Sequence, residues 1–408
     1  MSSDTPKPPN KWKRRILWIL ASIGVLAVVG IVMAVIVIRN AATAATPSAF
    51  YTPPDPLPAG EPGTIIRSEP LTDNVPEGAA AWRVMYLSTD ENGEPIAVTG
   101  SVIAPAGEST EPRPVIAWTH GTAGIFPECG LSHTANPFQA APDVPLMVEQ
   151  GFVVTLTDYP GLSTPGVHPY MVGPVAAHAA LDSVRAAQQL EVDAGDRVVV
   201  WGASQGGNSS LWTAQLAETY APELTLLGAA ASAPAIDLAT LWGTFLDSQF
   251  GGVLMGYILY AWDNHYPDAN LDEIIKPEQR ETFERMVHLC LTTPAAFFTL
   301  GSDNILTPNE YLISSPLETE PWRTILEENA PRGAIEVPIL ITHGTADSLI
   351  PFTESEAEAE RRCAAGEDVQ FARYPGVSHD SSRESAVMVI GWIEDRFAGR
   401  PTGSNCGE

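Results

Sequence analysis

Short apolar runs alternate with helical stretches along most of the chain, and this pattern restricts the possible folds most strongly. The runs are predicted as strands at Val115–Thr119, Phe152–Thr157, Arg197–Trp201, Leu226–Ala231 and Pro338–Thr342, with helices at Val175–Gln189 and Ser209–Thr219. Uniformly apolar strands between helices are typical of a mainly parallel sheet that is covered on both faces. An antiparallel hairpin is expected before them, at Ala81–Ser88 and Ile96–Ile103.

The N-terminal segment has a different character. Ile16–Ile38 is a run of 23 uncharged, mostly apolar residues, long enough to cross a hydrocarbon layer of about 30 Å. Basic residues precede it, so residues 1–15 are predicted to be a cytoplasmic tail and 16–38 a transmembrane signal anchor. Ala42-Thr43-Ala44 would suit cleavage of a signal peptide, which is the alternative and leads to secretion. Both alternatives place the rest of the chain outside the cytoplasm.

The remaining sequence divides into a linker and one large domain. Residues 39–63 are rich in Pro and Ala and are predicted to be a linker, and residues 64–408 a single domain. Residues from about 236 to 310 interrupt the alternating pattern with many aromatic and aliphatic side chains. A segment of this length between core strands is predicted to be an inserted helical cap. Whether the cap moves as a lid is not decided by the sequence.

The charge balance excludes one large class of function. The formal net charge is −27, yet residues 1–40 hold six basic side chains and one acidic side chain, which leaves 16 basic and 48 acidic groups beyond them. Nucleic-acid binding requires a basic surface, so no nucleic-acid partner is expected. The four cysteines, Cys129, Cys290, Cys363 and Cys406, all follow the apolar segment. In an oxidising compartment an even number suggests two disulfides, while metal-binding spacings are absent, so no metal site is expected.

A possible nucleophile lies between a predicted strand and a predicted helix. Gly202-Ala203-Ser204-Gln205-Gly206 directly follows the strand Arg197–Trp201 and matches the pattern Gly-x-Ser-x-Gly. In this context Gly202 and Gly206 permit a tight turn that raises the Ser204 hydroxyl above the sheet. The alternative is a glycine-rich turn with a capping serine.

A serine nucleophile requires a base and a group that orients the base. In a strand-turn-helix context of this kind the chain order is serine, acid, histidine. Asp347 lies in a tight turn after the predicted strand Pro338–Thr342, and His379 follows the predicted strand Gln370–Arg373. Asp347 is therefore predicted to orient His379, while His343 is expected to be structural.

Two backbone N–H groups are candidates for binding an oxyanion. The first belongs to Gln205, the residue after the nucleophile, and the second to Thr122 in the loop that follows the strand Val115–Thr119. His120 in the same loop is expected to brace the loop or pack in the core.

Several of these segments in order resemble the secretory lipases of the lipase A type, within the α/β-hydrolase superfamily. The likeness rests on Asp158-Tyr159-Pro160-Gly161, on residues 201–207 and 214–224, and on the segments around Asp347 and His379. The resemblance implies an α/β-hydrolase fold, hydrolysis of acylglycerols or simple acyl esters, and no metal or organic cofactor. It also implies the disulfides Cys129–Cys290 and Cys363–Cys406.

We therefore expect a serine esterase or lipase that acts on neutral ester substrates, is a monomer, and meets the membrane through its N-terminal helix. A peptidase or acyltransferase with the same three residues is the nearest alternative. A non-catalytic binding protein of the same fold is the alternative from another class, although such proteins usually lack one of the three residues.

Overall fold

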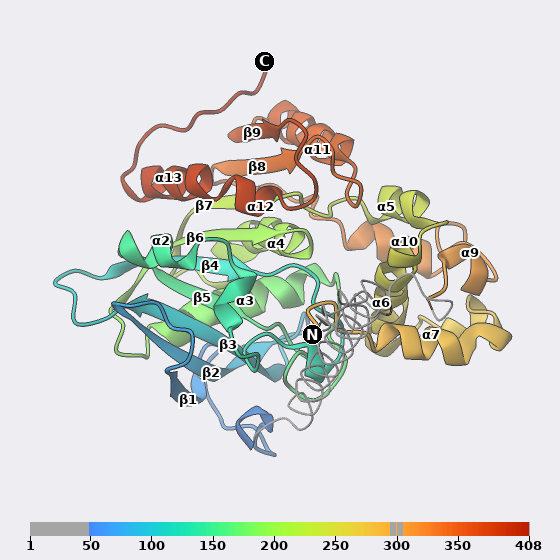
Figure 1. Ribbon diagram of the computed structural model, residues 1–408, viewed down its shortest axis with the longest axis horizontal. Coiled ribbons are helices and arrows are strands. Elements are labelled where there is room, and N and C mark those ends of the chain that lie inside the picture. The colour runs from blue at the N-terminus through green and yellow to red at the C-terminus, as the bar shows by residue number, and fades with distance from the viewer. Residues whose placement is uncertain (1–48, 294–298, 300–304, 408) are drawn as a thin grey trace, which may run out of the picture. The chain divides into compact units, whose positions relative to one another are not determined.

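The core of the protein is one mixed sheet of nine strands (Figure 1). The strands are β1 (Ile65–Leu71), β2 (Ala79–Thr89), β3 (Pro95–Pro105), β4 (Arg113–Thr119), β5 (Val153–Thr157), β6 (Ala194–Ala203), β7 (Thr225–Ser232), β8 (Ile339–Gly344) and β9 (Val369–Tyr374). Their spatial order is β1-β2-β3-β5-β4-β6-β7-β8-β9. The pairs β1–β2, β2–β3 and β3–β5 are antiparallel, and all pairs from β5 to β9 are parallel. The mainly parallel sheet and the hairpin are thus confirmed, while β1 is an additional edge strand.

The computed structural model describes residues 49–293, 299 and 305–407. The predicted cytoplasmic tail and the anchor at 16–38 lie outside this range. Within the described residues, no helix is both long enough and apolar enough to span a bilayer.

Helices cover both faces of the sheet because successive residues of each central strand point to opposite sides. In β4, Ile116 and Trp118 pack in one core cluster, and Val115 and Ala117 pack in another. The first cluster includes side chains of α2 (Val144–Glu149) and α13 (Ala386–Phe397). The second includes side chains of α3 (Gly173–Ala187) and α4 (Gln205–Tyr220). Two further helices, α11 (Phe352–Ala364) and α12 (Ser381–Glu384), contact β8.

A group of helices lies between β7 and β8, where the inserted cap is predicted, and it extends beyond residue 310. Its helices are α5 (Leu238–Phe245), α6 (Gln249–His265), α7 (Arg280–Val287), α9 (Pro308–Tyr311) and α10 (Trp322–Glu328). Trp322, Ile325 and Leu326 of α10 belong to the same buried cluster as the side chains of α5 and α6. The predicted boundary near residue 310 is therefore too early, because α10 completes the cap core by packing against α5.

The folded part also begins earlier than predicted. Ala49–Tyr51 forms a short 3-10 helix, and Phe50 and Tyr51 are buried against Met85 of β2. The Arg67 Nη1 atom donates a hydrogen bond of 2.7 Å to the Ala49 carbonyl oxygen. These two aromatic side chains supply apolar burial that a free linker would not have, so the predicted linker through residue 63 is too long. Within the described residues, packing against the sheet therefore reaches back to Phe50 rather than beginning near Thr64.

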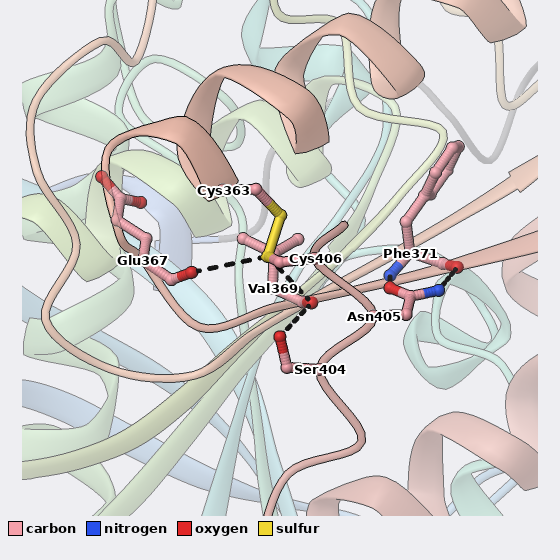
Figure 2. Close-up of a disulfide and its surroundings, with 7 residues drawn as sticks. All are labelled: Cys363, Glu367, Val369, Phe371, Ser404, Asn405 and Cys406. Carbon is pink, nitrogen blue, oxygen red and sulfur yellow. Dashed lines mark hydrogen bonds between the residues drawn. A yellow bond between two sulfur atoms is a disulfide. The ribbon is translucent and has the colours of Figure 1, made fainter. Parts of the chain in front are cut away.

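The C-terminal tail covers the free edge of β9 (Figure 2). The side-chain amide of Asn405 accepts a hydrogen bond from the Phe371 N–H at 2.8 Å and donates one to the Phe371 carbonyl at 3.0 Å. The Asn405 N–H bonds the Val369 carbonyl at 3.1 Å, and Cys406 forms a disulfide with Cys363 of α11. The tail thus occupies backbone groups that an edge strand would otherwise expose.

Candidate active site

Ser204 occupies a strained turn between β6 and α4. Its backbone angles are φ 59° and ψ −119°, a conformation that a residue with a side chain rarely adopts. A Cβ atom on Gly202 would lie 2.0 Å from Thr119 Oγ1, and one on Gly206 would lie 1.9 Å from the Thr119 carbonyl oxygen. Both positions therefore require glycine, because the end of β4 lies too close to the end of β6 and to the start of α4 for a side chain at either position.

The turn brings Ser204 beside the loop that follows β4. The Ser204 N–H donates to the Ser232 carbonyl at the end of β7, at 2.9 Å. A Cβ atom on Gly121 would lie only 3.7 Å from the Ser204 Cβ atom and 3.3 Å from the Ala203 carbonyl oxygen. Helix α4 begins at Gln205, the residue directly after Ser204, rather than at Ser209. The two segments expected to supply oxyanion-binding N–H groups therefore both lie against the candidate nucleophile.

A buried segment before α3 contacts both residues that are candidates for binding the oxyanion, Thr122 and Gln205. Its Tyr170 OH lies 2.7 Å from Thr122 Oγ1, and its His168 Nε2 lies 2.9 Å from Gln205 Nε2. The His168 Nδ1 atom lies 3.0 Å from the Pro160 carbonyl oxygen, so Nδ1 carries the proton and Nε2 accepts from the Gln205 amide. Burial, with a further contribution from His120, lowers the pKa of His168 to about 3, which keeps the imidazole neutral.

Replacing His168 with phenylalanine is expected to lower kcat about tenfold with little change in KM. The variant keeps a ring to stack on Tyr159 but leaves the buried Gln205 amide without its acceptor, so the neighbouring N–H is held less firmly where the oxyanion develops. Steady-state kinetics on p-nitrophenyl butyrate would measure both constants. His178→Phe is the matched control, because His178 stacks on Tyr220 instead. An equal loss of kcat in both variants would contradict the bracing role of His168.

Asp347 and His379 are joined directly. Asp347 lies in the turn after β8 and its Oδ2 atom is 2.7 Å from Nδ1 of His379, which lies in the loop after β9. The other oxygen, Oδ1, accepts hydrogen bonds from the N–H groups of Leu349 and Ile350 at 2.8 and 3.0 Å. Burial acts to raise the pKa of Asp347, but the hydrogen bonds from His343 and His379 outweigh it and hold this pKa well below its usual range. Asp347 is therefore a carboxylate at neutral pH.

The loop that carries His379 is packed tightly onto the Asp347 turn. A Cβ atom on Gly344 would lie 2.2 Å from the Val377 carbonyl oxygen, and the Ala346 N–H donates to that oxygen at 3.0 Å. Asp380 is adjacent to His379 in the sequence, but its carboxylate lies 3.5 Å from the Arg383 side chain. Ser204, Asp347 and His379 follow β6, β8 and β9, which run parallel in the same sheet. All three residues therefore lie at the carboxyl ends of the strands.

His343 contributes a contact that the sequence analysis missed. It is fully buried, as expected for a structural residue, but its Nε2 atom also lies 3.0 Å from Asp347 Oδ2. The signal available in the sequence was the spacing of four residues across a tight turn. His120 behaves as expected, because its two ring nitrogens face the carbonyl oxygens of Gly121 and Asp158, at 2.6 and 3.3 Å. It braces the loop rather than facing Ser204.

The cap is fastened to the loop that contains Thr122. The disulfide Cys129–Cys290 joins the two, and the Leu291 N–H donates to the Ala123 carbonyl at 2.8 Å. Both disulfides thus have the pairing that the resemblance implies. Among the residues that the structure describes, no group of three or more His, Cys, Asp or Glu side chains could hold a metal ion.

Comparisons with known proteins identify the family and the fold. The family model described as secretory lipase matches residues 143–405. Lipase 10 of Candida albicans is 27% identical over 88% of this chain and 82% of its own length. A Mycobacterium tuberculosis protein named as a probable inactive lipase is 26% identical over 86% of this chain and 82% of its own.

A solved structure of Candida antarctica lipase A superposes with a TM-score of 0.76 at 20% identity, covering 88% of this chain and 87% of that one. At this identity the likeness concerns the fold, which is the expected α/β-hydrolase fold. The family match extends from the helix before β5 to the C-terminal tail and includes Ser204, Asp347 and His379. The chain belongs to the secretory lipase family.

Proposed function

We propose that this secretory lipase hydrolyses neutral carboxylic esters through an acyl-enzyme formed on Ser204. The Ser204 hydroxyl attacks the ester carbonyl while His379 Nε2 accepts its proton. Asp347 holds the imidazole through Nδ1 and stabilises the imidazolium. The N–H groups of Gln205 and Thr122 bind the oxyanion, and His379 then protonates the departing alcohol. Water enters by the reverse sequence and releases the acid, so no cofactor takes part.

The observation that carries the proposal is the hydrogen bond of 2.7 Å between Asp347, whose side chain is fully buried, and His379, whose side chain is partly exposed. This hydrogen bond lies at the carboxyl ends of the parallel strands, where the strained turn at Ser204 follows β6. A buried carboxylate that orients a histidine at the carboxyl ends of the strands has no evident structural purpose, but it is required to activate a serine. The family also includes a relative named as a probable inactive lipase. The retained serine, acid and histidine support an active enzyme here over a non-catalytic binding protein.

The substrate class follows from charge and family. Residues beyond position 40 hold 48 acidic and 16 basic side chains, which disfavours approach to anionic lipid surfaces. Relatives carry names such as lipase, secreted triacylglycerol lipase and trichothecene C-3 esterase. These names support uncharged acylglycerols or simple acyl esters as substrates for this chain.

The cellular location is part of the same proposal. The catalytic unit is exported, and residues 16–38 retain it at the cell membrane as a signal anchor. The support is the 23-residue uncharged run with basic residues before it. Two disulfides in the described chain fit an oxidising compartment.

A fluorophosphonate probe is expected to label the folded protein on Ser204, as identified by mass spectrometry of the labelled peptide. Ser204→Ala should remove the label, and Ser210→Ala, a buried serine on α4 whose hydroxyl bonds backbone carbonyls, should retain it. Failure to label the folded protein, or labelling that survives Ser204→Ala, would refute the proposal. Product analysis in the presence of alcohols would separate hydrolysis from acyl transfer.

A further inference from the structure

Two histidines bind the same oxygen of Asp347. Oδ2 lies 2.7 Å from His379 Nδ1 and 3.0 Å from His343 Nε2, and Oδ1 is occupied by two backbone N–H groups. A carboxylate offers about four positions for hydrogen bonds, so all of them are filled. The side chains of Asp347 and His343 are both fully shielded from solvent. The catalytic scheme uses only His379, and the second histidine needs an explanation of its own.

The surroundings of His343 determine where its proton lies. Nε2 faces two acceptors, Asp347 Oδ2 and the Ile350 carbonyl oxygen at 3.1 Å, so it carries a hydrogen. Nδ1 lies 2.7 Å from Oγ of Ser355, a fully buried residue of α11. The hydroxyl of Ser355 can donate to Nδ1, which completes the neutral tautomer with hydrogen on Nε2. The chain of hydrogen bonds therefore runs from Ser355 through His343 to Asp347.

We propose that His343 is a positioning residue that fixes Asp347 Oδ2 toward His379 and shares part of the negative charge on that oxygen. The inference rests on the proposed function. A donor on Oδ2 competes with the protonated His379 for the lone pairs and the negative charge of that oxygen. Asp347 therefore stabilises the imidazolium form of His379 less strongly. The free imidazole that must accept the Ser204 proton is thereby available at lower pH.

The other titratable groups nearby leave this interpretation intact. Among the described residues, the titratable side chains that hydrogen-bond Asp347 are His343 on β8 and His379 after β9. Helix α11 presents the neutral hydroxyl of Ser355, whereas Glu354 on the same helix faces the first residues of the cap. Asp380 is adjacent to His379, but its side chain is 64% exposed and is therefore well screened.

The test compares the pH dependence of kcat/KM for three variants on p-nitrophenyl butyrate. His343→Leu removes the donor, so the acid limb should move to higher pH by about half a unit to one unit. The plateau value of kcat should also fall about tenfold, because Oδ2 is held less firmly. His343→Gln places an amide N–H near the former Nε2 position and should return the acid limb toward that of the wild type.

Ser355→Ala is the matched control. It removes a buried hydrogen bond from the far side of His343 and lowers stability, but Nε2 still donates to Asp347. Its acid limb should therefore coincide with that of the wild type. The inference is overturned if the limb of His343→Leu does not move, or if Ser355→Ala moves it by the same amount.

A measurement on the wild-type protein covers the case in which His343→Leu does not fold. Long-range nitrogen-proton correlation spectra should show His343 with hydrogen on Nε2 at neutral pH, assigned by the signals lost in His343→Gln. A hydrogen on Nδ1 alone would overturn the inference. Failure of the proposed function is distinguishable, because the wild-type protein would then not be labelled on Ser204 by the fluorophosphonate.

Discussion

Ser204→Ala, His379→Ala and the double variant are each expected to lose about 10⁶-fold in kcat on p-nitrophenyl butyrate, with no further loss in the double variant. Each residue acts only through the other, since the hydroxyl is a poor nucleophile without a base and the base has no proton to accept without the hydroxyl. The variants should still hydrolyse the ester faster than water alone does, because substrate binding and the oxyanion-binding N–H groups remain.

Asp347→Asn should cost less, about 10⁴-fold, because the serine and histidine remain but the imidazole loses the acceptor that fixes its tautomer. Asp380→Asn is the matched control and should retain full kcat, since Asp380 faces Arg383 rather than His379. Circular dichroism and thermal unfolding would verify folding of each variant. If the losses in Ser204→Ala and His379→Ala multiplied in the double variant, the two residues would not act as a unit.

Replacing Cys129 and Cys290 together with serine is expected to lower the free energy of unfolding by up to about 5 kcal/mol, the second largest effect. The bridge closes a loop with a sequence separation of 161 residues, and longer loops lose more entropy in the unfolded chain when they are closed. The same bridge joins the segment after α7 to the segment that follows Thr122. We therefore also expect kcat to fall, because one of the oxyanion-binding segments loses its anchor.

The control is the pair Cys363→Ser/Cys406→Ser, whose bridge closes a separation of 43 residues and fastens the tail to the edge of β9. It should lose up to about 4 kcal/mol and keep wild-type kcat. Guanidinium unfolding and steady-state kinetics would measure both pairs. Unchanged kcat in the first pair would show that the cap tether does not support the site.

The parts of the fold that depend on local pattern were predictable. β4, β6 and β8 are short apolar runs bounded by turns, and the observed strands differ from the expected ones by a few residues. The hairpin β2–β3 was expected at Ala81–Ser88 and Ile96–Ile103, and the two strands pair in antiparallel fashion there. The ends of the domain were not predictable in this way. Phe50 and Tyr51 lie in a proline-rich segment, and only their packing on β2 shows that they belong to the core.

The residues of the site divide in the same manner. A strand, a Gly-x-Ser-x-Gly turn and a helix identify Ser204, and the order of acid and histidine after it points to Asp347 and His379. The bracing contacts of His168 and Tyr170 carry no such signature. These two residues meet Gln205 and Thr122 through hydrogen bonds between segments distant in the chain, and no local periodicity encodes such contacts.

The sequence by itself determined the sheet, the family and the three residues proposed for catalysis, because each depends on a local pattern or on chain order. The tertiary structure decided which oxygen of Asp347 faces His379, that His343 shares it, and that the cap is fastened to the loop of Thr122. These properties depend on distances of a few ångströms between elements that are far apart in the chain, and hydrogen bonding and charge sharing act only over such distances.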